Sequence, residues 1–232
     1  MDYHSEPPPP WLSPGSRMTG SVIERLTLAR IIPVVEITDA RKGVELARSL
    51  SAAGLPIAEV TLRTPAALEA IRAIASEVPD FLVGAGTLLT SAQVAEAAAA
   101  GAHFGVSPGF TRTLSQSAAD ADLPFLPGAV TASEVLAAAE SGHTHLKFFP
   151  AEQSGGTSAI AAFSAPFAGL GIRFMPTGGV RPANLNSYLA IPSIFAIGGT
   201  WIAPRDQITA GRFTEIAEAA RAAVASAAAH RA

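Results

Sequence analysis

The chain contains two lysines, and one of them, Lys147, lies in the apolar segment His-Leu-Lys-Phe-Phe-Pro of residues 145–150. Read as a strand, this segment places His145, Lys147 and Phe149 on one face, because strand side chains alternate. A charged ammonium is unfavourable in a dry interior, so a buried lysine tends to release its proton and become a nucleophile. Such an amine can form a Schiff base with a carbonyl substrate. The alternative is a lysine that reaches water or pairs with a carboxylate.

A carboxylate that could act with this amine is Glu59, in the segment Glu-Val-Thr-Leu-Arg-Thr of residues 59–64. Alternation puts Glu59, Thr61 and Arg63 on one face of a predicted strand, with Glu59 directed inward and Arg63 reaching over the mouth of the fold. A carboxylate enclosed with the lysine could serve as a general base. A structural ion pair with Lys147 or Arg63 is the alternative. Arg63 carries the planar set of donors that matches a carboxylate, although an exposed arginine at a helix start is often simply solvated.

Two glycine pairs form a third signal. Gly178-Gly179 and Gly198-Gly199 follow the predicted strands 173–177 and 194–198, and Thr200 comes directly after the second pair. Backbone N–H groups can approach an anion where no Cβ intervenes, and the phosphate sites of α/β barrels recur in the loops after strands seven and eight. Thr200 would add a hydroxyl. Tight turns are the alternative, but the positions of the two pairs favour a phosphate site.

The scaffold for these residues is predicted by an alternation of short apolar runs and amphipathic stretches. Strands are expected at residues 31–37, 57–61, 81–85, 103–107, 125–128, 145–149, 173–177 and 194–198. Helices are expected between the strands, for example at residues 40–53, 65–76, 92–100, 114–121 and 133–141, and a closing helix is expected at residues 214–228. Two helix starts carry capping signals, Thr64 before Pro65 and Thr131 with Glu134.

Eight strand–helix repeats favour a (β/α)8 TIM barrel with an additional N-terminal helix at residues 21–29 that covers its bottom. An open doubly wound sheet is the alternative fold, but the chain has no clear dinucleotide-binding fingerprint. In a TIM barrel, the residues that perform chemistry stand at the C-terminal ends of the strands. Lys147 and Glu59 would lie near the ends of strands six and two, so the barrel predicts that they share one interior.

Composition limits the classes of function. The chain has 232 residues, of which 49% are hydrophobic and 15% charged, so one domain spanning residues 21–232 is expected. A net charge of −3 gives no long-range attraction for nucleic acid. No apolar stretch reaches the ~18 residues of a membrane helix. We therefore expect a soluble protein with neither nucleic acid nor membrane as partner.

Metal binding is not favoured by the sequence. Cysteine is absent, which excludes disulfides and thiolate metal sites. His143 and His145 form an H-x-H pair without a third ligand nearby, so a structural or surface role is expected for them. Residues 1–20 are rich in proline, serine and glycine and are expected to form a disordered tail.

Several strings of the chain, taken together, resemble one known family. They are Glu-Val-Thr-Leu-Arg-Thr (59–64), Val-Gly-Ala-Gly-Thr-Leu-Leu (83–89), Ser-Pro-Gly (107–109), Lys-Phe-Phe-Pro-Ala-Glu (147–152), Gly-Gly (155–156) and Pro-Thr-Gly-Gly-Val (176–180). In order and spacing, from about Ser21 to Arg221, they resemble the class I 2-keto-3-deoxy-6-phosphogluconate (KDPG) aldolases of the Entner–Doudoroff pathway. Members of that family often also cleave 4-hydroxy-2-oxoglutarate (KHG).

The resemblance implies roles for the residues above. Lys147 would form the Schiff base and Glu59 would be the acid and base. The pyruvyl end of the substrate would be surrounded by Arg63, Thr87, Pro108 and Phe149. The phosphate would be bound by Gly178, Gly179, Gly198, Gly199 and Thr200. The resemblance further implies a cytoplasmic homotrimer that cleaves KDPG to pyruvate and glyceraldehyde 3-phosphate without a cofactor or metal.

Two positions depart from the family pattern. Thr200 stands where serine is usual, which keeps the hydroxyl but crowds the phosphate. Glu36 stands where relatives usually have an uncharged or basic residue, so it would either tune specificity or pair with Arg63. The alternatives for function are an aldolase acting mainly on KHG or on the galactonate-derived epimer, a metal-dependent pyruvate aldolase, and a barrel that only binds a sugar phosphate.

Overall fold

A computed structural model describes residues 21–230, in which strands and helices alternate. The strands are β1 (Ile31–Val35), β2 (Ile57–Thr61), β3 (Leu82–Gly86), β4 (Phe104–Val106), β5 (Phe125–Leu126), β6 (His145–Phe148), β7 (Arg173–Pro176) and β8 (Ile197–Gly199). The helices are α1 (Val22–Ala29), α2 (Ala40–Ala52), α3 (Ala67–Glu77), α4 (Ser91–Ala99), α5 (Arg112–Asp120), α6 (Ala132–Glu140), α7 (Gly156–Phe167), α8 (Pro182–Leu189), α9 (Arg205–Ala210) and α10 (Phe213–Ala228), with a short 3-10 helix, η2 (Ala168–Leu170).

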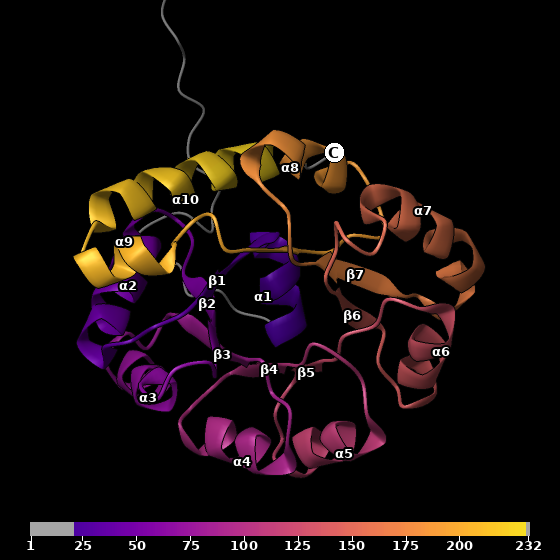
Figure 1. Cartoon of the computed structure of the whole chain (residues 1–232), viewed down its shortest axis with the longest axis horizontal. Helices are drawn as coiled ribbons and strands as arrows, with labels where there is room; N and C mark the ends of the chain where they lie inside the picture. The colour runs from indigo at the N-terminus through magenta and orange to yellow at the C-terminus, as the bar shows by residue number, and fades with distance from the viewer. Residues whose placement is uncertain (1–20, 231–232) are drawn as a thin grey trace, which may run out of the picture.

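The strands form a curled parallel sheet. Six of them are hydrogen-bonded in the order β5-β4-β3-β2-β1-β8, and β6 and β7 form a second parallel pair. Single bridges link this pair to its neighbours, Gly128 with Lys147 on one side and Thr177 with Gly198 on the other. The strands lie in the middle of the molecule and most of the helices surround them in a ring (Figure 1). All C-terminal strand ends therefore face the same side of the molecule.

The apolar residues explain why these segments form these elements. Every residue of β1, β2 and β3 is buried, as expected for parallel strands that are covered on both faces. The helices are rich in alanine and leucine, which favour helix, and turn one apolar face inward. In α10 that face consists of Ile216, Ala217, Ala220, Ala223 and Ala227.

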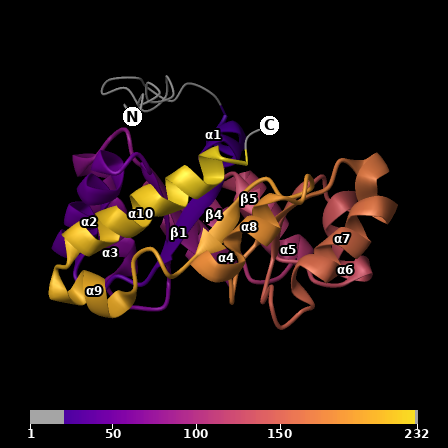
Figure 2. The same cartoon turned by 90° about the horizontal axis from the view of Figure 1, so that it is seen from above.

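Helix α1 lies on one side of the molecule, beside the end of α10 (Figure 2). Its start is a capping box, in which the hydroxyl of Ser21 accepts from Glu24 and the carboxylate of Glu24 accepts from Ser21. The guanidinium of Arg30 donates to the carbonyls of Leu189 and His230, which ties the end of α1 to α8 and to the C-terminal region. The expected tail, residues 1–20, lies outside the described residues. Within residues 21–230, no helix is long and apolar enough to cross a membrane.

The two predicted helix caps have different outcomes. The capping box of Thr131 and Glu134 is confirmed, because each residue's side chain accepts a hydrogen bond from the other's backbone N–H. The prediction that a helix begins at Pro65 after Thr64 is wrong. Helix α3 begins at Ala67, because the hydroxyl of Thr64 donates instead to the carbonyl of Ile37 and holds residues 62–66 in a turn.

The predicted boundaries of the eighth strand are also wrong. It was expected at residues 194–198, but β8 covers Ile197–Gly199. Ile194 makes only a single bridge to Phe174, so the first part of the apolar run packs without forming a continuous ladder. As a result, Gly198 and Gly199 lie within the end of the strand and not in the loop after it.

Candidate active site

Lys147 and Glu59 contact each other in the centre of the fold. The Nζ of Lys147, on β6, donates to Oε1 of Glu59, on β2, at 3.1 Å. The two side chains are only 6% and 0% exposed. Burying a charge without a partner is costly, so each group compensates the other. The structure thus brings together the two groups that the sequence suggested for chemistry, 88 residues apart in the chain.

The position of Lys147 follows from strand alternation. Its backbone N–H donates to Pro127 and its carbonyl accepts from Ala129, so β6 is held against the segment after β5. Its neighbours Leu146 and Phe148 are fully buried on the opposite face. The ammonium also lies over the ring of Phe149, 5.2 Å from the centroid, a cation–π contact that stabilises a positive charge at this point.

Glu59 depends on a glycine that the sequence analysis did not single out. A Cβ on Gly86, at the end of β3, would lie 2.1 Å from Oε1 of Glu59, so only glycine leaves room for the carboxylate. A glycine inside a predicted strand signals such a close approach. Within the described part of the chain, the second oxygen of Glu59, Oε2, is buried and has no hydrogen-bond partner. An unsatisfied buried acceptor is unfavourable, and it is available to a hydroxyl that enters the site.

Thr87 and Pro108 follow β3 and β4 at the same edge of the sheet. Thr87 has φ +61°, a left-handed backbone that is strained for a β-branched residue. Strain of this kind costs about 1–3 kcal/mol and concentrates at functional sites. The carbonyl of Pro108 packs on Gly128, where a Cβ would lie 2.1 Å from it. The loops after β4 and β5 are therefore locked together beside Lys147, which is bridged to Gly128.

Arg63 and Glu36 form an ion pair above this interior. Nη1 of Arg63 lies 3.1 Å from Oε1 of Glu36, so one of the two expectations for Glu36, a pair with Arg63, is confirmed. Oε2 of Glu36 lies 3.4 Å from Nη1 of Arg205, at the start of α9. Arg205 was not predicted as a site residue. No short-range pattern could have indicated it, because the contact joins residues 169 positions apart.

The two glycine pairs lie side by side, since a bridge joins Thr177 to Gly198. Gly178 and Gly179 follow β7 with φ +95° and +82°, a left-handed conformation that favours glycine. Gly198 and Gly199 are needed for a different reason, because a Cβ would lie 2.2 Å from the hydroxyl of Thr177 or 2.0 Å from the ring of Trp201. Thr200 is exposed directly after them.

The histidines of the H-x-H pair are occupied by structural contacts. Nε2 of His143 lies 2.7 Å from the hydroxyl of Ser115, and the ring of His145 packs edge-on against Phe195, 4.8 Å between centroids. Burial lowers the pKa of both imidazoles, with Arg173 adding to the effect on His145. In residues 21–230, no group of three or more histidine, cysteine, aspartate or glutamate residues could hold a metal ion.

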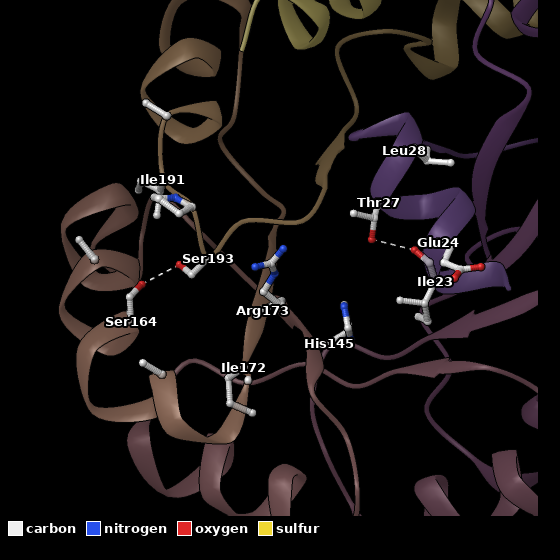
Figure 3. A pocket seen from close by; sticks show the side chains of 15 residues that line it. Ile23, Glu24, Thr27, Leu28, His145, Ser164, Ile172, Arg173, Ile191 and Ser193 are labelled. Carbon is white, nitrogen blue, oxygen red and sulfur yellow. Dashed lines mark hydrogen bonds between the residues drawn. The ribbon is translucent and has the colours of Figure 1, made fainter. Parts of the chain in front are cut away.

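Two cavities lie at opposite ends of the strands. One, of about 1230 Å³, is bordered by α1 and by His145 and Arg173, the first residues of β6 and β7 (Figure 3). It opens at the N-terminal ends, away from the edge that carries Thr87, Pro108 and Thr200. A smaller cavity of about 360 Å³ lies at that C-terminal edge and is lined by Val34, Glu36, Thr200, Trp201, Ala203, Pro204 and Arg205.

The fold and site define an α/β enzyme with a buried lysine–carboxylate pair. A family model described as "Aldolase: KDPG and KHG aldolase" matches residues 22–219. The chain is 45% identical to the KHG/KDPG aldolase of Escherichia coli K12 over 199 residues, covering 86% of this chain and 92% of that protein. It is 46% identical to the 2-dehydro-3-deoxy-phosphogluconate aldolase of Pseudoalteromonas atlantica over 198 residues, covering 85% and 91%.

Solved structures agree with this assignment. The KDPG aldolase of Legionella pneumophila, captured with pyruvate as a covalent carbinolamine intermediate, is similar with a TM-score of 0.83 and 36% identity. The match covers 87% of this chain and 98% of that one. The chain therefore belongs to the KDPG and KHG aldolase family, and it is an aldolase, which is a lyase.

Proposed function

We propose that this chain cleaves KDPG to pyruvate and glyceraldehyde 3-phosphate in the Entner–Doudoroff pathway, with Lys147 as the Schiff-base residue and Glu59 as the acid and base. The observation that carries the proposal is the buried contact between the two side chains. The names of the relatives and the covalent carbinolamine in the Legionella pneumophila structure support it.

The chemistry requires an electron acceptor next to the bond that breaks. Lys147 gives a proton to Glu59, its amine attacks C2 of the substrate, and the hydroxyl of the resulting carbinolamine takes that proton from Glu59 and leaves as water. The product is a protonated imine, which accepts electrons far better than a ketone. Glu59 then removes the proton of the C4 hydroxyl as the C3–C4 bond breaks, and glyceraldehyde 3-phosphate departs. The enamine that remains is protonated at C3, and water hydrolyses the imine to release pyruvate. The unpartnered Oε2 of Glu59 supports this assignment.

The remaining site residues are proposed to bind the two ends of the substrate. Arg63, Thr87, Pro108 and Phe149 would surround the pyruvyl end. The strained backbone of Thr87 and the position of Phe149 beside the lysine support that role. Gly178, Gly179, Gly198, Gly199 and Thr200 would bind the phosphate, which is supported by the bridge between Thr177 and Gly198 that brings the two glycine pairs near each other. Binding energy at the phosphate can orient the distant bond that breaks.

The larger organisation is also proposed. The strands close into a (β/α)8 barrel whose bottom is covered by α1, which is supported by the bridges from β6 and β7 to their neighbours. A single aldolase domain starts at residue 21, after the tail expected at residues 1–20. We also propose a cytoplasmic homotrimer that needs no cofactor or metal, which the family resemblance supports. The net charge of −3 supports the proposal that nucleic acid is not a partner, and the lack of a long apolar stretch supports the same for a membrane.

The deciding experiment combines turnover with trapping. Pyruvate release from KDPG and from KHG is measured, and the protein is then reduced with borohydride in the presence of pyruvate. We expect turnover of KDPG and a stable adduct on the peptide that contains Lys147. Lys42, the only other lysine, is the internal control. An adduct on Lys42, or turnover that a chelator abolishes while no adduct forms, would contradict the proposal, and turnover of KHG alone would favour the alternative substrate.

A further inference from the structure

Glu36 and its two arginines form a charged cluster at the C-terminal edge of the sheet, which we call the Glu36 cluster. Glu36 comes directly after β1, which pairs with β2 on one side and with β8 on the other. Arg63 follows β2 and Arg205 follows β8. One carboxylate therefore holds an arginine from each neighbouring loop, with distances of 3.1 and 3.4 Å.

The two arginines lie on different sides of Glu36. Arg63 is on the side of β2, the strand that carries Glu59. Arg205 lines the cavity of about 360 Å³ together with Thr200 and Trp201, next to the glycines of β8. Among the described residues that line this cavity, Arg205 is the one cation and Glu36 the one anion.

This arrangement creates an electrostatic problem for a phosphorylated substrate. The glycines offer backbone N–H groups but no net charge, and the nearby carboxylate of Glu36 repels a phosphate. A guanidinium has five donors, and Arg205 uses one of them, Nη1, on Glu36. The others remain able to donate to phosphate oxygens, for which the planar fork of arginine is well suited.

On the basis of the function proposed above, we propose that Arg205 is a specificity-determining residue that binds the phosphate of the substrate, with Glu36 as the positioning residue that holds Arg205 over Thr200. The Arg205–Glu36 contact is exposed and long, so it is weak and competes little with a phosphate. Arg63 remains available for the carboxylate at the pyruvyl end. The carboxylate at residue 36 is thereby compatible with an anionic substrate.

The first arm of the test compares substrates with and without phosphate. Arg205→Ala should lower kcat/KM for KDPG by about 10- to 100-fold, mostly through KM, as expected for a lost hydrogen bond to a charged group. KHG lacks the phosphate, so its kcat/KM should change by less than about 3-fold. Arg205→Lys should recover part of the loss. The matched control is Arg212→Ala, because Arg212, directly before α10, pairs with Asp206 of α9 and does not line the cavity.

The second arm separates binding of phosphate from neutralisation of Glu36. The same Arg205→Ala change is measured in a Glu36→Gln background, where no carboxylate needs a counter-ion. If Arg205 contacts the phosphate, the loss on KDPG persists in this background. If the loss disappears, or if KDPG and KHG suffer equally in a folded variant, Arg205 is not a phosphate-binding residue and the proposal fails.

The two proposals fail in different ways. Trapping with pyruvate involves no phosphate, so every variant of Arg205 should still form the adduct on Lys147. An unmodified protein that forms no adduct would overturn the proposed function itself. If the unmodified protein forms the adduct and cleaves KDPG, and the Arg205→Ala variant has the same kcat/KM for KDPG, only the role of Arg205 is overturned.

Discussion

At the scale of single residues, the pair of Lys147 and Glu59 could be predicted because both lie in short strands. A side chain in a strand can point to only one of the two faces of the sheet. One lysine inside an apolar run and one carboxylate on an inward face were sufficient signals. The glycine that makes room for the carboxylate, Gly86, was not anticipated. Glycine is required at position 86 because Glu59 of β2 lies against β3, and this contact becomes visible only when the two strands are paired in register.

Glu59→Gln tests the proton transfer at this scale. Glutamine has nearly the same shape, so it fits beside Gly86 and can still accept from the ammonium, but it cannot take a proton. We expect the variant to form the borohydride-trapped adduct with pyruvate and to lose about 10²- to 10⁴-fold in kcat. Glu77→Gln is the control, because Glu77 is an exposed partner of Arg48. Near-normal turnover of Glu59→Gln would mean that another group moves the proton.

At the scale of elements, the alternation of strands and helices could be predicted from the sequence, whereas the first or last residues of several elements could not. Thr64 has the sequence context of a helix cap, yet its hydroxyl bonds to Ile37 in another loop. The expected eighth strand began too early, since burial alone does not reveal where a ladder starts. Both errors have one cause, namely that a contact with a distant segment overrides a local preference.

The loops after β7 and β8 are best tested at Thr200. A valine at Gly179 would not be a clean probe, because its Cβ would lie 2.5 Å from Cγ of Glu152 and the backbone has φ +82°. Thr200→Val removes only the hydroxyl from an exposed residue. We expect kcat/KM for KDPG to fall by about 10-fold, as for one hydrogen bond to an anion, with KHG cleavage almost unchanged. Equal losses on both substrates would place the phosphate elsewhere.

At the scale of the whole molecule, an α/β fold with a curled parallel sheet could be expected from counting repeats, but the contacts between distant parts of the chain could not. Arg205 reaches Glu36 across 169 positions, and Arg30 reaches His230 across 200. Such contacts depend on how the last helices return to the first strands. A pattern within a short window of sequence contains no information about them, which is why Arg205 was not predicted together with the glycine pairs and Thr200.

Global stability should depend on pH through three partly buried histidines. Burial is the largest cause that lowers the pKa of His103, His143 and His145 in the folded protein. The folded pKa of each then lies below the unfolded value of about 6.5, so the unfolded chain binds protons first. The contribution of these histidines to the free energy of unfolding is therefore present above about pH 6.5 and is lost as the pH falls below it.

Thermal melting between pH 8 and pH 5, above the range where ordinary carboxylates titrate, measures this effect. The melting temperature should decrease toward pH 5, with each ~1 kcal/mol of lost stability lowering it by about 2–4 °C in a chain of this size. His143→Gln should show a smaller decrease, because glutamine can still bond to Ser115 and has no proton to gain. If the variant and the unmodified protein lose the same number of degrees, the buried His143 does not contribute to the pH dependence and the loss arises from other groups.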